Sequence, residues 1–324
     1  MPEGHSVHRI AAQFRRYFVG HTAAVSSPQG RFGDATILSG HAVRDSFAVG
    51  KHLFLEFDHG VFLHVHLGIY GAWDFAGAVA LDDTAASAGG RMGQTAGRGT
   101  VVGANEDSPW SIGAPRRTRL RMGEESSGRE DSGADFPPEP IGQVRCRILT
   151  ADAVADLRGP TVCEILGSDD VDRVIAGLGP DPIVEPGGGE RFAALLSRTR
   201  TPIAQALMNQ KIVAGIGNVY RAEMLFRAGI NPYQPANELD AEIVRELWSD
   251  WTYLLSVGVE TGQMLTMDGL SGEDYERALA HRADRHWVYH RTGQPCRRCG
   301  TPIAMDIVAT RKLYFCPSCQ GGTP

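Results

Sequence analysis

Lysine is nearly absent from this 324-residue chain. Of its 32 basic residues, 29 are Arg and three are Lys, namely Lys51, Lys211 and Lys312. Arg stays protonated whereas Lys exchanges a proton, so a Lys in this background can indicate a position that needs a titratable amine. Lys51, directly after Gly50 at the start of the strand-like segment KHLFLEF, is the candidate. A chance surface Lys is the alternative interpretation.

The chain also lacks long hydrophobic runs. No stretch of about 18 apolar residues occurs, which excludes an ordinary membrane-spanning helix. The N-terminal segment carries Glu3, Arg9 and Arg15 without a continuous apolar core, unlike a signal peptide. With 42% hydrophobic and 22% charged residues, the composition is typical of a globular protein with two or three domains. We therefore expect a cytoplasmic protein with no membrane partner.

Basic residues are fewer than acidic residues, and the net charge of the chain is -6. Spread evenly, this charge would argue against a nucleic-acid partner. The distribution is uneven. Residues 191–227 hold six basic and one acidic residue, and residues 281–324 hold seven basic and two acidic residues. Residues 231–280, in contrast, hold two basic and ten acidic residues. Such blocks predict a basic face on an acidic protein, with solvated helix surfaces as the alternative.

Cysteine is scarce and unevenly placed. Four of the six Cys form two CxxC pairs, which are Cys296, Cys299, Cys316 and Cys319. This spacing predicts one structural Zn²⁺ held by four thiolates, with no open ligand position. Arg311 and Lys312 lie at a predicted turn between the pairs, where cations suit phosphate contact or form an ordinary solvated turn. Cys146 and Cys163 are expected to be small core residues.

The N-terminal part, residues 1–170, is predicted to be an antiparallel β-sandwich with a leading helix. Apolar residues recur at helical spacing over 5–18. Segments of alternating polarity that predict strands occupy 51–58, 60–68, 70–77 and, as a hairpin, 143–159. A Gly-, Ser- and Pro-rich stretch of about 81–142 is predicted to be a flexible insertion, with a short strand at RTRLRM (117–122).

The C-terminal part is predicted to contain a helical domain, residues 171–290, and a zinc β-hairpin finger, 291–324. In TPIAQALMNQKIVAGIGNVYRAEMLFRAGINP, Thr201 is a natural N-cap, and Asn218 caps a second helix after an extended turn. Unpaired N–H groups at that second N-terminus, behind two glycines, can bind phosphate, although a tight turn with an Asn cap explains the same pattern. The fold class is therefore α+β multidomain.

His64 and His66 alternate in FLHVHLG and share one face of a strand. A metal pair would need a third ligand at suitable spacing, and the sequence offers none. Core or interface histidines with hydrogen-bond partners are the favoured interpretation.

The first residues, MPEG, combine two chemically useful groups. Removal of the initiator Met would leave the secondary amine of Pro2 at the N-terminus. Terminal amines have pKa values of about 8, so a useful fraction is nucleophilic at neutral pH. Attack on a carbonyl-like carbon would give a charged iminium, and the adjacent Glu3 could act as general acid. A Pro-Glu pair that merely precedes a helix is the alternative.

Five separated motifs together resemble one family. MPEG, GKHLFLEF, HLGIYGAW, the AGIGN segment and CRRCGTPI with TRKLYFCPSCQ are similar, in order, to motifs of the formamidopyrimidine-DNA glycosylase and endonuclease VIII family of base-excision repair enzymes. The resemblance covers all three predicted domains except the insertion, and the PEG opening is closer to the endonuclease VIII branch, in particular its actinobacterial members. It implies a monomeric, nucleoid-associated DNA glycosylase and abasic-site lyase that acts on damaged single- or double-stranded DNA, with oxidised pyrimidines favoured.

The resemblance also implies catalytic roles. Pro2 attacks C1′ of the deoxyribose while Glu3 protonates the ring oxygen, and β,δ-elimination then cleaves the strand. Lys51 matches the family's cation near the lesion phosphate, where it serves as acid-base partner. Arg311 matches the zinc-finger arginine at the flipped nucleotide, whose extrusion costs a few kcal/mol.

For DNA binding, Asn218 matches a phosphate ligand of the helix-two-turn-helix motif. Ile69 and Tyr70 match the position where the family fills the void left by the flipped base, and Arg158 is assigned to a void or phosphate contact. The chain departs from the family pattern at two places. His5 and Ser6 replace a more usual Pro-Glu, which removes a carboxylate near the flipped base, and Gly68 replaces a frequently polar residue.

A different class of protein shares several of these features. A non-catalytic zinc-finger protein that binds damaged DNA would keep the zinc finger and the helix-two-turn-helix motif. It would have no need of Pro2, Glu3, Lys51 and Arg311 together.

Overall fold

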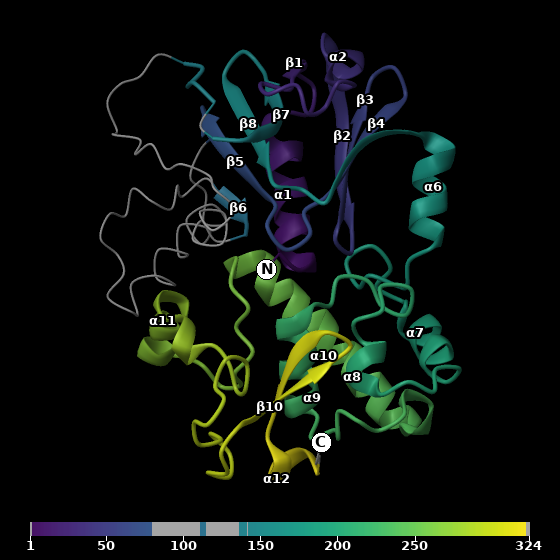
Figure 1. The fold of residues 1–324 in the computed structure, drawn as a ribbon, viewed down its shortest axis with the longest axis vertical. Helices are drawn as coiled ribbons and strands as arrows, with labels where there is room; N and C mark the ends of the chain where they lie inside the picture. Colours follow the sequence, from purple (N-terminus) through teal and green to yellow (C-terminus); the bar gives the residue numbers. More distant parts are fainter. Residues whose placement is uncertain (1, 80–110, 115–135, 141, 322–324) are drawn as a thin grey trace. The chain divides into compact units, whose positions relative to one another are not determined.

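The computed structural model describes residues 2–79, 111–114, 136–140 and 142–321 (Figure 1). The chain divides into two compact units, Met1–Ala176 and Gly177–Pro324. The strand predicted at 117–122 lies outside the described residues. Among the described residues, no helix is long and apolar enough to cross a membrane.

Helix α1 (Gly4–Tyr17) lies inside the first unit, between the two halves of its sheet (Figure 1). The predicted apolar stripe is buried and includes Ile10 and Phe14. The ring of Phe14 lies 4.8 Å from the Trp73 ring and 5.3 Å from the Phe75 ring, measured between centroids. The helix predicted over 5–18 is therefore confirmed, with its apolar face packed against the sheet.

In the described part of the first unit, nine strands pair antiparallel in the order β6-β5-β8-β7-β1-β2-β3-β4-β9. Their bounds are β1 (Thr22–Ser26), β2 (His41–Val49), β3 (His52–Phe57), β4 (Val61–His66), β5 (Ala72–Gly77), β6 (Ser111–Gly113), β7 (Val144–Leu149), β8 (Ala153–Arg158) and β9 (Val162–Gly167). Strand β1 pairs with both β2 and β7 and so joins the two halves. The unit also contains α2 (Ala35–Leu38) and α6 (Ser168–Ala176). The predicted antiparallel fold with a leading helix is confirmed.

Strand register brings three connections to one end of this sheet. His52 pairs with both Val49 and His66, and Ala72 pairs with Arg158. The β2–β3 turn, the β4–β5 loop and the β8–β9 loop therefore lie at the same end. Figure 1 shows that α1 also begins there.

The segment predicted as a flexible insertion, about 81–142, supplies part of the sheet. Strand β6 pairs with β5 at the sheet edge, and Ile112 is buried. The guanidinium of Arg147 donates to the carbonyl oxygen of Pro138 over 2.6 Å. The described part of this stretch therefore contains an edge strand, at Ser111–Gly113, that the sequence did not predict.

The described part of the second unit contains helices and a two-stranded hairpin. Their bounds are α7 (Gly189–Leu196), α8 (Ile203–Ala206), α9 (Asn218–Arg227), η2 (Ala236–Glu238), α10 (Ala241–Thr261), α11 (Gly272–Ala280), η3 (Arg282–Asp284), β10 (Ala304–Val308), β11 (Arg311–Phe315) and α12 (Pro317–Gln320). The N-caps of α8 and α9 are Pro202 and Gly217, each one residue from the predicted caps. Leu313 and Phe315 of β11 share a core with α9 and α10.

Candidate functional site

Pro2 and Glu3 directly precede α1, and both are buried. Glu3 is the N-cap residue, with an extended backbone, and its carbonyl oxygen accepts a hydrogen bond of 2.9 Å from the backbone N–H of Ser6. Its side chain lies at the positive end of the helix dipole and is screened from solvent. The hydroxyl of Ser6 is also hydrogen bonded to Nε2 of His5 at 3.1 Å. Pro2 is thus followed directly by a residue with a buried carboxyl group.

The loop between β4 and β5 presents two apolar side chains at the same end of the sheet. Ile69 is 38% exposed and Tyr70 is 41% exposed. The preceding Gly68 has a φ of 63°, and a Cβ there would lie 1.8 Å from Oγ1 of Thr161. A side chain at position 68 is therefore excluded by the β8–β9 loop. This steric limit accounts for Gly at position 68, and Ile69 and Tyr70 are the exposed apolar side chains of the loop.

Lys51 lies in the tight turn between β2 and β3, after Gly50 with its φ of 59°. Burial, with smaller contributions from neighbouring imidazoles and from the positive charge of Lys51, lowers the pKa of His52 to about 3 and that of His66 to about 4. Both imidazoles are therefore neutral at physiological pH. Lys51 is therefore a cationic side chain beside neutral histidines.

Arg158, at the end of β8, forms an ion pair with Asp74 of β5. The Nε atom and the Asp74 Oδ2 atom are 2.7 Å apart, and the Arg158 side chain is 12% exposed. The structure thus shows Arg158 holding two strands together, and its contact with DNA stays a prediction.

Asn218 begins α9 and contacts the hairpin of the same unit. Its Nδ2 donates to the carbonyl oxygen of Lys312 over 2.8 Å. Arg221, one turn later and wholly buried, donates to Oδ1 of Asn218 over 2.5 Å and to the same Lys312 carbonyl over 3.0 Å. A longer contact of 3.5 Å reaches the carbonyl of Ala204 in α8. Arg221 therefore fixes the orientation of the Asn218 amide and ties both helices of the motif to the hairpin.

Arg311 follows a hairpin turn with an unusual backbone. Ala309 has a φ of 48° and Thr310 a φ of 66°, which is the left-handed region that non-Gly residues rarely occupy. Two consecutive residues of this kind form the turn type that matches the strand twist of a two-residue hairpin. The turn therefore sets the start of β11, where Arg311 lies, at a cost in backbone strain.

The four predicted cysteines converge in the second unit. Their sulfur atoms all lie within 4.8 Å of one another, and the pairs Cys296–Cys319 and Cys299–Cys316 are 3.9 Å and 3.5 Å apart. A tetrahedral zinc with Zn–S bonds of about 2.3 Å separates its sulfur ligands by about 3.8 Å. The cluster therefore fits one structural Zn²⁺, held by thiolates alone.

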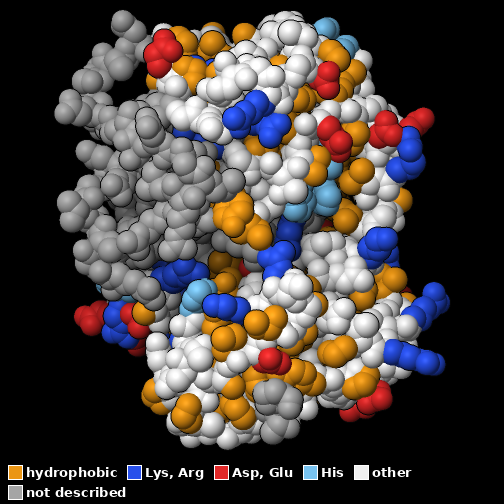
Figure 2. All heavy atoms as spheres, in the orientation of Figure 1, with side chains coloured by type: hydrophobic (Ala, Val, Ile, Leu, Met, Phe, Trp, Pro, Cys, Tyr) orange, Lys and Arg blue, Asp and Glu red, His pale blue; other side chains and the backbone are white. Residues whose placement is uncertain are grey.

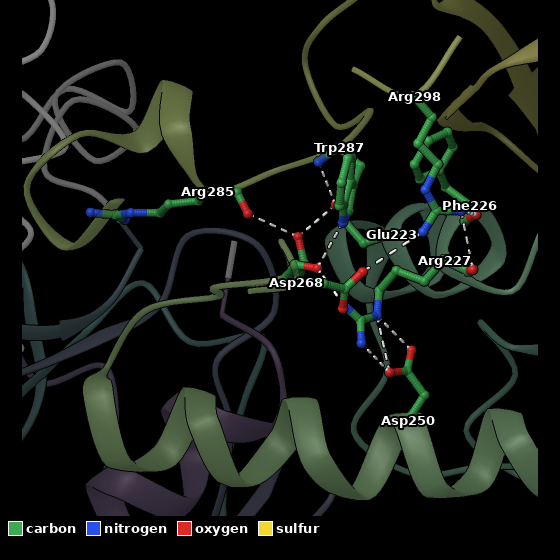
Figure 3. Close-up of polar contacts among 9 residues, drawn as sticks. Glu223, Phe226, Arg227, Asp250, Asp268, Arg285, Trp287 and Arg298 are labelled. Carbon is green, nitrogen blue, oxygen red and sulfur yellow. Dashed lines mark hydrogen bonds and ion pairs between the residues drawn. The ribbon is translucent and has the colours of Figure 1, made fainter. Parts of the chain in front are cut away.

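Glu223 of α9 is a buried charged group that sequence reasoning missed. Its carboxylate accepts hydrogen bonds from the Thr266 hydroxyl and from three consecutive backbone N–H groups, those of Trp287, Val288 and Tyr289, over 2.5–2.9 Å. Burial raises the pKa of Glu223, and these hydrogen bonds oppose the shift. Glu223 thus anchors the segment that leads into the zinc finger (Figure 3).

Arg298, between the first two cysteines, packs the zinc knuckle against α9. Its guanidinium carbon lies 4.6 Å from the Phe226 ring centroid and 4.9 Å from the Trp287 ring centroid. Nη1 donates to the carbonyl oxygens of Phe226 and Arg227 over 3.2 and 3.3 Å. Figure 3 shows this arginine pointing at the end of α9. The knuckle is therefore coupled to the helix that begins with Asn218.

Ion pairs neutralise part of the basic charge counted in the sequence. Arg227 is 2.7 Å from a carboxylate oxygen of Asp250 and also pairs with Asp268 (Figure 3). Within each unit, the Lys and Arg side chains of the described residues that Figure 2 shows stand in separate groups. The acids of 231–280 thus partly offset the neighbouring basic segments within the second unit.

Replacing Arg221 with Met is expected to weaken DNA binding about tenfold and to lower the free energy of unfolding of the second unit by about 2 kcal/mol, because buried acceptors on Asn218 and Lys312 lose their donor. Fluorescence anisotropy and chemical denaturation measure the two effects. Arg221→Lys should recover part of the affinity. Arg245→Met, which removes an exposed ion pair with Glu242, is the control. Wild-type affinity in Arg221→Met would contradict the assigned role.

Comparison with known proteins identifies the family. Residues 1–122 match the profile of the formamidopyrimidine-DNA glycosylase N-terminal domain, 178–268 that of the formamidopyrimidine-DNA glycosylase H2TH domain, and 293–321 that of a zinc finger found in FPG and IleRS. Endonuclease 8 1 from Mycobacterium tuberculosis is 35% identical over 321 residues, which cover 99% of this chain and 100% of that protein. The formamidopyrimidine-DNA glycosylase of Parasynechococcus marenigrum is 37% identical over 147 residues, 45% of this chain and 52% of that protein.

Solved structures show the same fold. The crystal structure of the MutM (Fpg) protein from Thermus thermophilus aligns with a TM-score of 0.66 at 23% identity, over all of both chains. A Lactococcus lactis Fpg complex with DNA that contains N7-benzyl-Fapy-dG aligns with a TM-score of 0.68 at 20% identity, over 99% of this chain and 100% of that chain. The chain therefore belongs to the formamidopyrimidine-DNA glycosylase and endonuclease VIII family, and it is a DNA glycosylase of base-excision repair.

Proposed function

We propose that the protein removes oxidised bases, pyrimidines in particular, and cleaves the resulting abasic site through a Schiff base on Pro2. The observation that carries the proposal is the burial of Pro2 and Glu3, two adjacent residues at the start of α1, at the sheet end that also holds the Lys51 turn. A nucleophilic amine and a general acid on adjacent residues are the two groups that this reaction requires.

The proposed reaction follows from these groups. The Pro2 nitrogen, freed by removal of Met1, attacks C1′, and the base leaves with the electron pair of the glycosidic bond and takes up the proton that the Pro2 nitrogen loses. Glu3 protonates O4′ as the C1′–O4′ bond breaks, which opens the sugar ring and leaves an iminium between the Pro2 nitrogen and C1′. The iminium withdraws electrons and acidifies the C2′–H bond. Loss of that proton breaks the C3′–O bond, and a second elimination breaks the C5′–O bond. Each phosphate leaves with its electron pair.

The remaining predicted residues bind DNA in this proposal. Lys51 acts on the phosphate of the lesion, and Asn218 and Arg311 bind backbone phosphates at the flipped nucleotide. Ile69 and Tyr70 fill the space that the flipped base leaves, at the unstacking cost typical of such enzymes. Arg158 makes a further contact with the DNA in this proposal. The preference for oxidised pyrimidines rests on similarity to mycobacterial proteins named Endonuclease 8.

Glu3→Gln is expected to separate the two steps. Base release from DNA with an oxidised pyrimidine should fall by about 10²-fold or more, the range for loss of a positioned general acid. Cleavage of a preformed abasic site, which needs no base departure, should fall much less. Single-turnover assays on the two substrates measure the ratio. Equal loss on both substrates would contradict the role of Glu3 as acid in base release.

A further inference from the structure

Two histidines and an aspartate converge at the end of the first unit's sheet that lies away from the Lys51 turn. His41 begins β2, and Asp58 and His59 lie in the turn between β3 and β4. Nδ1 of His41 lies 2.8 Å from Oδ1 of Asp58, and Nδ1 of His59 lies 3.7 Å from the same oxygen. The candidate ligand atoms of the three residues all lie within 4.8 Å of one another. Strand β3 runs from His52, next to Lys51, to the turn that holds Asp58, a span of about 20 Å.

Backbone contacts hold this cluster in place. Oδ2 of Asp58 accepts a hydrogen bond of 3.1 Å from the Ala42 N–H, and the Asp58 N–H donates to the Ala42 carbonyl oxygen over 2.9 Å. Gly60, with a φ of 77°, closes the turn by donating to the carbonyl oxygen of Phe57 over 2.9 Å. The carboxylate is therefore tied to β2 through one oxygen, and its other oxygen is the one near both imidazoles.

The two imidazoles stack on each other and remain accessible to solvent. Their ring centroids are 3.6 Å apart and their planes differ by 20°. The side chains of His41, Asp58 and His59 are 39%, 50% and 24% exposed, so an ion can reach the cluster. Two imidazolium ions at this separation would repel each other, which favours at least one neutral ring with a lone pair. The carboxylate disfavours an anion and favours a cation.

The donor set selects the kind of cation. Two imidazole nitrogens and one carboxylate oxygen suit Zn²⁺ and the neighbouring transition metals, whereas Mg²⁺ and Ca²⁺ prefer oxygen ligands alone. In a tetrahedral zinc site with bonds of about 2.1 Å, the ligand atoms are about 3.4 Å apart. The distances from Oδ1 of Asp58 to the Nδ1 atoms of His41 and His59, 2.8 and 3.7 Å, lie on either side of that value. Small side-chain rotations would therefore bring the three atoms to one ion.

We propose that His41, Asp58 and His59 bind a divalent transition-metal ion, with Zn²⁺ as the probe, that joins the start of β2 to the turn between β3 and β4. The inference goes beyond the proposed function and does not rest on it. Before the metal binds, Nδ1 of His41 donates to the carboxylate, which only accepts. On binding, that proton moves to Nε2 or to solvent, and the Nδ1 lone pair coordinates the ion. Three protein ligands leave a position for water, unlike the closed site of four cysteines, and the affinity is correspondingly lower.

Zinc stoichiometry of the full chain tests the site. After dialysis against zinc-free buffer the protein should keep the one zinc of the finger, and with Zn²⁺ in excess it should hold two, as measured by equilibrium dialysis and elemental analysis. Asp58→Asn, whose amide oxygen can still accept from the Ala42 N–H, and His59→Ala should each weaken binding of the second zinc at least tenfold. His281→Ala, which replaces a half-buried histidine of the second unit, is the control and should bind both ions as the wild type does.

Two further measurements report the ligands and the location. Co²⁺ in the finger should give thiolate-to-metal charge-transfer absorption, whereas a second equivalent should add only weaker ligand-field bands, because its ligands are nitrogen and oxygen. Zn²⁺ at about 100 times the dissociation constant of the second site should raise the midpoint of thermal unfolding of the first unit by about 5–10 °C. Asp58→Asn should lose both effects, and Mg²⁺ at the same concentration should cause no shift in the wild type.

The outcomes decide the proposal without reference to DNA chemistry. Equal binding of the second zinc by the wild type, Asp58→Asn and His59→Ala would overturn it, as would an equal thermal shift with Mg²⁺. Thiolate absorption from the second Co²⁺ would also overturn it, because that result would assign the additional ion to cysteine. None of these measurements uses a DNA substrate, so failure of the proposed glycosylase mechanism would leave the metal site standing, and the reverse holds too.

Discussion

Replacing Pro2 with Gly is expected to reduce borohydride trapping of abasic DNA by about two orders of magnitude, and acetylation of the N-terminal nitrogen should abolish it. The secondary amine forms a charged iminium without a further proton transfer, whereas an amide nitrogen is not nucleophilic. Gly leaves a more mobile primary amine before the buried Glu3 at the start of α1. Denaturing gels that resolve the protein–DNA adduct measure the effect.

The control for this prediction separates chemistry from binding. DNA affinity of Pro2→Gly, measured by anisotropy, should stay within about threefold of wild type, because the phosphate contacts are assigned to other residues. Pro28→Gly, in the loop after β1, should trap normally. Salt-sensitive DNA binding that continues after acetylation, with no adduct from untreated protein, would instead favour the non-catalytic DNA-binding alternative.

Removal of zinc is expected to unfold the finger and to weaken DNA binding at least tenfold. A structural zinc site supplies about 10 kcal/mol or more of folding free energy in small metal-dependent segments. Loss of the knuckle releases Arg298 from its place between Phe226 and Trp287 and so disturbs the end of α9. The hairpin that accepts hydrogen bonds from Asn218 and Arg221 is lost with it.

Metal analysis should give one zinc per chain, and Cys299→Ser should reproduce the effect of a chelator. Circular dichroism and anisotropy follow unfolding and binding, and added Zn²⁺ should restore both in the unsubstituted protein. The first unit, which holds none of the four cysteine ligands, should keep its own unfolding transition. Full DNA affinity after complete zinc removal would contradict the role assigned to the finger.

The strands predicted from sequence are those with clear alternation, such as β3 and β4. Strand β2 was missed because a bulge between Val43 and Asp45 breaks its alternation. Strand β1 is a short segment, Thr22–Ser26, with small side chains and a weak pattern. Strand β6 lies within Gly- and Ser-rich sequence and is specified by its pairing with β5. Tertiary pairing therefore determined the elements that local patterns could not.

The same distinction applies to the site. The zinc ligands could be predicted from spacing, because each CxxC pair is local. Gly68 could be recognised in the sequence as a departure from the family pattern. The reason for a glycine there, the close contact that a Cβ would make with Thr161, required the structure. Arg221 and Glu223 were missed because their partners are distant in the chain, as with Arg221 and Lys312. The available signal was that Arg221 and Glu223 stand among the apolar residues of α9, since buried charges require partners.

The most direct test of the account is mass spectrometry of the borohydride-reduced adduct between the untagged protein and abasic DNA. After digestion, the account predicts the sugar fragment on the nitrogen of Pro2, in a peptide that lacks Met1. A fragment on Lys51 or another amine, or a protein that incises DNA while Met1 is still attached, would contradict it.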